Sequence, residues 1–392
     1  MKNPLKKLKL KRRGITVLAG MHFFGNPSAK LKVVGVTGTN GKTTTATLLY
    51  KITTELGYKA GLIGTVENII VNERRPALIT TPSPINLYKL LNEMADRGCE
   101  YVFMEVSSHA LDQNRVAGIN FVGGIFTNLT HDHLDYHKSI DNYFGAKKKF
   151  FKMLPKDAFA LSNIDDEYGL RMLEHIQAKK YTYGLKNKAD FSEKLQTGLI
   201  GDFNAYNALA VYAASILLGF DKGKVVEVLK KVTPPRGRFE HFTSKSGVLV
   251  IIDYAHTPDA LENVLKTAQG IRKDGSKIIS VFGCGGDRDP AKRKIMGKIG
   301  VLFSDIAIFT SDNPRNEDPE KIIEEMKADL SPDDFKKIKT IPNRREAILE
   351  SVKLAQSGDI ILCAGKGHEE YQDIKGVKNH FNDMEEYKKA YA

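Results

Sequence analysis

A glycine-rich segment near the start of the chain restricts its fold more than any other feature. Residues 35–44 read Gly-Val-Thr-Gly-Thr-Asn-Gly-Lys-Thr-Thr, after a β-branched run at 31–36 and before a helix-like stretch at 43–56. Glycines at such a turn let backbone amides close around phosphate oxygens, and the helix N-terminus adds partial positive charge. The segment therefore predicts a phosphate-binding loop within an α/β fold.

Further apolar runs alternate with helical patterns. Residues 101–106 and 122–127 are typical of buried strands that end in polar turns. Pro82-Ser83-Pro84 predicts the start of another helix, with Ser83 as N-cap and Pro84 at the first helical position. The order strand, helix, strand indicates a parallel sheet with ligands at the carboxyl ends of its strands.

A stiff, turn-rich stretch at 234–237, Pro-Pro-Arg-Gly, is the predicted linker to a second domain. Beyond it, strand candidates lie at 248–252, 277–282, 305–309 and 359–363, with helical patterns between them. The length of 392 residues allows two to three domains. We expect a basic leader at 1–30, a central P-loop ATP-binding domain at 31–235 and a Rossmann-like α/β domain at 236–392.

The composition is typical of a globular cytoplasmic enzyme. Apolar residues make up 42% and charged residues 27% of the chain, and no run approaches the ~18 apolar residues of a membrane span. Cys99, Cys284 and Cys363 lie far apart without CxxC spacing, which favours free thiols in a reducing cytosol and argues against zinc. The N-terminus lacks the apolar core of a secretory signal. We expect a cytoplasmic monomer.

The net charge of +12 is unevenly distributed. Residues 1–32 hold nine Lys and Arg and no acidic residue, which leaves +3 for the other 360 residues. A body so close to neutral does not suggest a nucleic-acid-binding groove. The basic leader is suited to peripheral contact with an anionic membrane or with a diphosphate, and a solvated leader without such a role is the alternative.

The glycine-rich segment contains the groups that nucleotide binding requires. Lys42 can neutralise the β- and γ-phosphates, and the Thr43 hydroxyl can ligate Mg²⁺. The generic pattern has a further glycine at the position of Val36, and a glycine-rich turn without a ligand is the alternative. The predicted nucleotide contacts are Gly38, Thr39, Asn40, Gly41, Lys42, Thr43 and Thr44.

Two polar motifs follow the next strand candidates. Glu105 lies at the end of the first, where its carboxylate can hold a cation. Residues 128–137, Asn-Leu-Thr-His-Asp-His-Leu-Asp-Tyr-His, place three histidines within seven positions. A pH-sensitive surface loop is the alternative, and histidine plus carboxylate beside ATP chemistry suits Mg²⁺ or Mn²⁺ better than zinc.

The loop from Gly38 to Thr44 resembles that of the Mur ligase family, which also includes folylpolyglutamate synthases. The resemblance implies that His133 serves a second Mg²⁺ and that Lys147 is carbamylated and bridges metals. By composition alone, Lys147-Lys148-Lys149 is a solvated helical face.

The same resemblance assigns further nucleotide contacts. Asn204 and Asn207 share one helix face at i, i+3 and are expected to face the adenine, with helix capping by Asn204 as the alternative. Arg238 is expected to reach the γ-phosphate, and Asp253 the ribose.

Three polar turns follow strand candidates of the second domain. They read Gly-Cys-Gly-Gly-Asp-Arg-Asp at 283–289, Asp-Asn-Pro-Arg at 312–315 and Ala-Gly-Lys-Gly-His-Glu at 364–369. Such turns converge on one rim of a parallel sheet, where arginines and a glutamate can clamp a zwitterion. In the family, Asp-Asn-Pro-Arg marks users of meso-diaminopimelate. The implied amino-acid contacts are Arg288, Asp312, Asn313, Arg315, Gly365 and Glu369, and the implied acceptor-peptide contacts are Thr80, Thr81, Ser107 and Arg115.

The resemblance thus implies an ATP- and Mg²⁺-dependent amide ligase of cell-wall precursor synthesis, with a diamino acid and a muramyl peptide as substrates. An acyl phosphate is the implied intermediate. The family's N-terminal domain, which grips the uridine diphosphate, is not recognisable in the sequence. The alternatives are a folylpolyglutamate synthase, a related ligase with another amino acid or a lipid-linked acceptor, and a nucleotide-binding scaffold.

Overall fold

The computed structural model describes residue 20 and residues 23–392. Its internal contacts divide the chain into two compact units, the first ending at Thr233 and the second beginning at Pro234. The division lies two residues before the boundary expected from the sequence. Most of the basic leader, and with it the expected membrane contact, lies outside the described residues.

The first unit is built on an eight-stranded sheet in the order β4-β3-β2-β5-β1-β6-β7-β8. Six strands run parallel, and the β3–β4 hairpin adds an antiparallel edge. The strands are β1 (Lys32–Thr37), β2 (Ala60–Ile63), β3 (Glu67–Ile70), β4 (Glu73–Pro76), β5 (Tyr101–Glu105), β6 (Phe121–Phe126), β7 (Phe159–Asn163) and β8 (Lys179–Tyr183). The predicted strands at 31–36, 101–106 and 122–127 are confirmed within one residue at each end.

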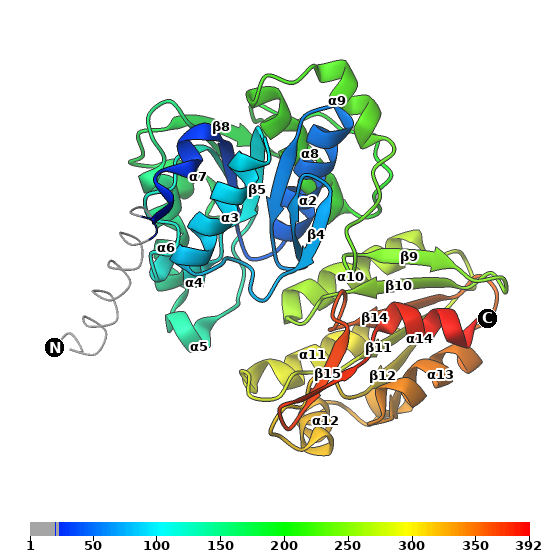
Figure 1. Cartoon of the computed structure of the whole chain (residues 1–392). Coiled ribbons are helices and arrows are strands. Elements are labelled where there is room, and N and C mark those ends of the chain that lie inside the picture. Colours follow the sequence, from blue (N-terminus) through cyan, green and yellow to red (C-terminus); the bar gives the residue numbers. More distant parts are fainter. Residues whose placement is uncertain (1–19, 21–22) are drawn as a thin grey trace. The chain divides into compact units, whose positions relative to one another are not determined.

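Helices cover both faces of this sheet, as Figure 1 shows. One core includes residues of α3 (Pro84–Asp96), α4 (Ser108–Asp112), α6 (Ile140–Met153) and α7 (Gly169–Leu173). The other includes residues of α2 (Lys42–Glu55), α8 (Asp202–Leu217) and α9 (Lys222–Leu229). The short elements η1 (Pro27–Lys30) and α5 (Leu134–His137) lie at loops.

The helix α3 begins as its sequence predicts. Pro84 occupies the first turn and Ser83 the N-cap position, although the Ser83 side chain makes no capping hydrogen bond. Leu87, Leu91 and Met94 are fully buried, because their spacing places them on one helix face toward the sheet.

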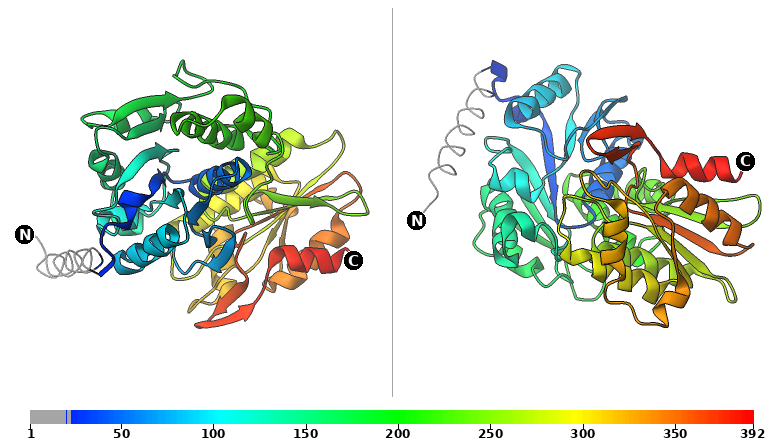
Figure 2. Two further views of the ribbon diagram at one scale, coloured as in Figure 1. Left: turned by 45° about the horizontal axis from the view of Figure 1, so that its top comes forward. Right: turned by 90° about the horizontal axis from the view of Figure 1, so that it is seen from below.

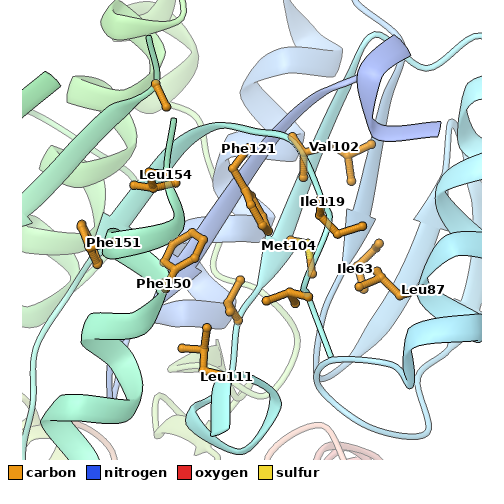
Figure 3. Packing of buried hydrophobic residues seen from close by; sticks show 14 of the residues in the cluster. Ile63, Leu87, Val102, Met104, Leu111, Ile119, Phe121, Phe150, Phe151 and Leu154 are labelled. Carbon is orange, nitrogen blue, oxygen red and sulfur yellow. The ribbon is translucent and has the colours of Figure 1, made fainter. Parts of the chain in front are cut away.

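The core beneath α6 depends on glycines in the strands. Figure 3 shows Phe150 beside Phe121, and their ring centroids are 5.0 Å apart in an edge-to-face arrangement. A Cβ atom on Gly35 of β1 would lie 2.4 Å from Phe150 Cζ, and one on Gly124 of β6 would lie 2.8 Å from Phe150 Cε1. The aromatic ring therefore fills space that only glycine leaves open.

The second unit contains a six-stranded sheet in the order β13-β12-β11-β14-β10-β9, parallel except for the β9 edge. Its strands are β9 (Glu240–Thr243), β10 (Leu249–Asp253), β11 (Ile278–Phe282), β12 (Ile306–Phe309), β13 (Ile338–Thr340) and β14 (Ile360–Ala364). Its helices are α10 (Pro258–Ile271), α11 (Ala291–Phe303), α12 (Pro319–Lys327), η2 (Asp334–Lys337), α13 (Arg344–Leu354) and α14 (Asp383–Ala390). All four predicted strands are present.

A separate hairpin, β15 (Tyr371–Ile374) and β16 (Val377–His380), follows β14. Figure 2 shows it in red, outside the six-stranded sheet. It pairs with the turn after β12, because Arg315 N–H donates to the Asp373 carbonyl and Lys375 N–H donates to the Arg315 carbonyl. In both units the predicted polar motifs follow the carboxyl ends of parallel strands.

Among the helices that the structure describes, each is too short or too polar to cross a membrane.

We predict that Gly35→Ala lowers the free energy of unfolding by about 1–3 kcal/mol, because the added methyl overpacks the core against Phe150. The matched control is Gly145→Ala in α6, where a Cβ meets nothing within 4 Å. Alanine there should stabilise by up to about 1 kcal/mol through helix propensity. Urea unfolding followed by circular dichroism measures both, and equal effects would contradict the packing argument.

Candidate active site

The glycine-rich loop joins β1 to α2, and two of its glycines are required by close contacts. A Cβ on Gly38 would lie 1.8 Å from Thr127 Oγ1, and one on Gly41 would lie 2.4 Å from Asn207 Oδ1. Gly41 also has a φ of 84°, which side-chain-bearing residues rarely adopt. The loop is thus pressed against the end of β6 on one side and against α8 on the other.

Hydrogen bonds hold the loop in shape. The Asn40 N–H donates to Asn128 Oδ1 at 2.8 Å. Lys42 Nζ folds over the loop and donates to the carbonyls of Gly38 (3.0 Å) and Thr39 (2.7 Å). The ammonium group therefore lies above the turn, where a phosphate-binding lysine is needed.

A carboxylate lies beside the first turn of the helix that follows the loop. Glu105, at the end of β5 and 1% exposed, accepts hydrogen bonds from Thr43 Oγ1 (3.0 Å), Thr65 Oγ1 (3.0 Å) and the Thr65 N–H (2.7 Å). Hydroxyl and carboxylate oxygens are the ligands that Mg²⁺ prefers. The predicted pair of Thr43 and Glu105 is therefore brought together, with Thr65 as a third partner.

Lys147 lies in the core of the site. Its side chain is 1% exposed, its Nζ donates to the Gly38 carbonyl at 2.6 Å, and it stands 4.4 Å from the ring centroid of Tyr143. Burial and the neighbouring Lys42 ammonium hold the pKa of Lys147 well below its usual value. The solvated helical face that composition alone predicts is wrong for Lys147 and Lys148, which are buried, and right for Lys149.

The histidine motif forms a cluster around α5. His109 packs with its ring centroid 4.8 Å from that of His133 and 5.6 Å from that of His137. His137 is buried against the Ser108 hydroxyl at 3.0 Å, and desolvation lowers its pKa to about 4. His133 is 42% exposed, with Nε2 3.4 Å from Asp132. No group of three or more His, Cys, Asp and Glu side chains within residues 23–392 is arranged to hold a metal by itself.

The four residues expected to hold an acceptor peptide are linked around Glu105. Thr81 Oγ1 donates to the Glu105 carbonyl at 2.8 Å and lies 3.2 Å from Ser107 Oγ. Arg115 donates to the Thr81 carbonyl at 2.8 Å. Thr80 Oγ1 lies 3.0 Å from Thr65 Oγ1, which joins this group to the Glu105 site.

The two asparagines of α8 share one face, as predicted. Both are buried, and Asn207 Nδ2 donates to Asn204 Oδ1 at 3.2 Å. The alternative of capping by Asn204 is wrong, since Gly201 is the N-cap residue and Asn204 Nδ2 donates to the Ile200 carbonyl at 2.8 Å.

In the second unit, Asp253 is the last residue of β10, and its side chain binds backbone groups on both sides of that strand in the sequence. Its buried carboxylate accepts from the backbone N–H groups of Phe239 and Ala255, each at 2.7 Å. Burial raises its pKa to about 6, although Arg238 opposes this shift. The Arg238 guanidinium stacks on Tyr254 at 4.5 Å.

The turns after β12 and β14 meet directly. Asn313 Nδ2 donates to Glu369 Oε2 at 2.8 Å. A Cβ on Gly365 would lie 2.3 Å from Asp312 Oδ2, and the φ of Gly365 is 113°. The buried Lys366 completes the group with bonds to both Asn313 and Glu369.

The turn after β11 joins the same rim. The Gly286 N–H donates to the Asn313 carbonyl, and the Arg315 guanidinium donates to the Gly286 carbonyl. Arg315 has a φ of 51°, an unfavourable conformation for a side-chain-bearing residue. Arg288, two residues after Gly286, is exposed. The three turns predicted to converge therefore do so.

The sequence profile of the Mur ligase middle domain matches residues 36–215, and that of the Mur ligase glutamate ligase domain matches residues 237–367. The chain is 51% identical over 391 residues to UDP-N-acetylmuramoyl-L-alanyl-D-glutamate–2,6-diaminopimelate ligase of Bacteroides fragilis, which covers 95% of this chain and 81% of that protein. The chain belongs to the Mur ligase family. Members of this family are ATP-dependent amide ligases that form ADP.

Solved structures agree with this assignment. A 2,6-diaminopimelate ligase of the same name is 35% identical, with a TM-score of 0.63 over 92% of this chain and 78% of that one. Folylpolyglutamate synthase of Mycobacterium tuberculosis, complexed with ADP, gives a TM-score of 0.71 over 90% and 91% of the two chains. At 20% identity, that likeness shows a shared fold alone.

Sequence reasoning missed three residues of this Mur ligase site. Thr65 follows the end of β2, and the rule that polar residues after parallel strands face a site would have found it. The same rule would have found Lys366, two residues after β14. Tyr143 gave no such signal, because its hydroxyl lies 3.2 Å from Thr39 Oγ1, which is 104 residues away in the sequence.

We predict that Glu105→Gln reduces kcat for phosphate release from ATP by about 10²–10³-fold, because it removes a charge from a preorganised site. Glu100→Gln is the matched control, since Glu100 is exposed just before the same strand. Its activity should stay within twofold of the wild type. Similar losses in both variants, at unchanged melting temperature, would contradict the role of Glu105.

Proposed function

We propose that this Mur ligase joins meso-diaminopimelate to a carboxyl group of UDP-MurNAc-L-Ala-D-Glu, or of a related muramyl dipeptide, and converts ATP to ADP and phosphate. The observation that carries the substrate assignment is the meeting of the turns after β11, β12 and β14. Asn313 contacts Glu369, and Arg315 contacts Gly286. The 51% identical relative that bears this name supports the same assignment.

The reaction follows from the chemistry of a carboxylate, which is a poor electrophile. An acceptor carboxylate oxygen attacks the γ-phosphorus of ATP, the new O–P bond forms, and the bond to ADP breaks. The amine nitrogen then attacks the acyl carbon, phosphate leaves, and the nitrogen loses a proton. The first step brings two anions together, and Lys42 above the phosphate loop offsets this repulsion.

The residues present fit Mg²⁺. Thr43 and Glu105 offer a hydroxyl and a carboxylate that already lie 3.0 Å apart, and we propose that they hold the first cation. His133 and a carbamylated Lys147 are the proposed ligands of a second. Bound Mg²⁺ supplies charge neutralisation for phosphoryl transfer.

The amino-acid site is proposed to use opposite charges. Arg288 and Arg315 present guanidinium groups that suit carboxylates, and Glu369 presents a carboxylate that suits an ammonium. Asp312, Asn313 and Gly365 shape the turns between them.

For the remaining site residues we propose the roles that the sequence analysis gave them. Within the first unit we propose that Thr80, Thr81, Ser107 and Arg115 hold the acceptor peptide and that Asn204 and Asn207 face the adenine. Gly38, Thr39, Asn40, Gly41 and Thr44 are proposed to contact the phosphates. In the second unit we propose Arg238 for the γ-phosphate and Asp253 for the ribose.

The carbamylation of Lys147 is proposed from its burial. A lysine fully enclosed beside a second ammonium favours the neutral amine, and the neutral amine is the form that adds CO₂. The carbamate formed would be an oxygen ligand in place of a carboxylate.

We predict phosphate release that depends on the muramyl dipeptide and meso-diaminopimelate, with kcat/KM for L-lysine at least tenfold lower, because L-lysine lacks the second carboxylate. Arg315→Lys should lower kcat/KM for meso-diaminopimelate by about 10–100-fold, since the lysine side chain cannot make the bidentate contact of the arginine. The preference for meso-diaminopimelate over L-lysine should therefore become smaller. Arg345→Lys is the control, because Arg345 is an exposed arginine on α13 that pairs with Glu386. Equal turnover of both amino acids by the wild type removes the role of Arg315, and no turnover with either points to another acceptor.

We predict that ¹³C-labelled bicarbonate gives a carbamate resonance in the wild type that Lys147→Arg abolishes. Lys148→Arg is a demanding control, because Lys148 is also buried and its pKa is lowered to about 8 by desolvation. The resonance should survive there. Loss of the signal in Lys148→Arg alone would contradict the assignment.

A further inference from the structure

A second buried lysine lies in the amino-acid rim of unit two. Lys366 follows β14 by two residues and is 0% exposed. Its Nζ donates to Asn313 Oδ1 at 3.1 Å and to Glu369 Oε2 at 2.9 Å. The proposed function assigns the amino acid to Asn313 and Glu369, and it gives Lys366 no part.

The chemistry of the donors fixes the orientation of the Asn313 side chain. An ammonium and a backbone N–H can only donate, and Asn313 Oδ1 receives both, from Lys366 and from Asp373 N–H at 2.9 Å. The amide nitrogen must therefore point the other way. It donates to Glu369 Oε2 at 2.8 Å.

The contact between Lys366 and Glu369 also balances the charge of the buried ammonium. A buried ammonium without a counter-charge is costly, and here the Glu369 carboxylate balances it. The Glu369 side chain is 15% exposed while that of Lys366 is 0% exposed. A ligand can thus reach the carboxylate but not the ammonium that holds it.

We propose that Lys366 is a positioning residue for amino-acid recognition, which fixes the Asn313 amide and the Glu369 carboxylate for the zwitterionic centre of the substrate. This inference rests on the proposed function. Lys366 does not touch the ligand, and its effect passes through its two partners. The β15–β16 hairpin supports the same geometry from the other side, through Asp373.

The test compares Lys366→Met, Glu369→Gln and the double variant with the wild type. Lys378→Met is the matched control, because the ammonium groups of Lys366 and Lys378 both lie over the Tyr371 ring, at 5.6 and 4.2 Å, whereas Lys378 is exposed. Phosphate release is measured while meso-diaminopimelate and ATP are varied separately. Melting temperatures are recorded for every variant.

We expect Lys366→Met to raise KM for meso-diaminopimelate at least about tenfold, as loss of a charge-assisted contact implies, with KM for ATP within twofold. Lys378→Met should leave both within twofold. In the Glu369→Gln background, Lys366→Met should raise KM for meso-diaminopimelate by a smaller factor than it does in the wild type, because one of its two partners is already changed while Asn313 remains. An unchanged KM for the amino acid, parallel rises in both KM values, or multiplied effects in the double variant would overturn the proposal.

A wild type without diamino-acid-dependent phosphate release refutes the proposed function and not the positioning role. Crystal structures of the wild type and of Lys366→Met then test the positioning role of Lys366. Rotation of the Asn313 amide or displacement of the Glu369 carboxylate supports the inference. An unchanged contact between them overturns it.

Discussion

The ammonium groups of Lys42 and Lys147 donate to the same backbone oxygen, that of Gly38. The two lysines come from different helices, α2 and α6, and meet only because the loop passes between them. Gly38 has no room for a side chain beside Thr127. One carbonyl oxygen therefore ties the phosphate loop to both helices and brings two lysine side chains together where an anionic substrate is expected.

The closeness of the two lysines affects the protonation of Lys147. Two cations on one neutral oxygen repel each other, which favours the neutral amine at the more deeply buried Lys147. Glu105 is the nearby negative charge at the end of β5, and it is held by Thr43 and Thr65 rather than by either lysine. The lysines thus contact a backbone carbonyl, while the carboxylate contacts the two threonines.

Much of the fold was predictable, because parallel strands appear as short apolar runs followed by polar turns, and all the strands expected from such runs are present. The pairing of Asn204 with Asn207 was predictable from helix periodicity. The burial of Lys147 was not, since three consecutive lysines look solvated until the position of α6 over the loop is known. The sequence could place Thr65 and Lys366 at strand ends, but local patterns could not identify their partners Glu105 and Asn313, which are 40 and 53 residues away.

The two buried lysines show how their partners determine what they can do. Lys147 contacts a neutral carbonyl and lies near another cation, and burial outweighs the opposing effect of Asp132 on its pKa. Lys366 contacts a carboxylate and an amide oxygen, and so joins the side chains of Glu369 and Asn313. A buried amine that contacts no carboxylate is suited to react, whereas an ammonium paired with a carboxylate is suited to hold that carboxylate in place. The same residue type therefore supports chemistry in the first unit and positioning in the second.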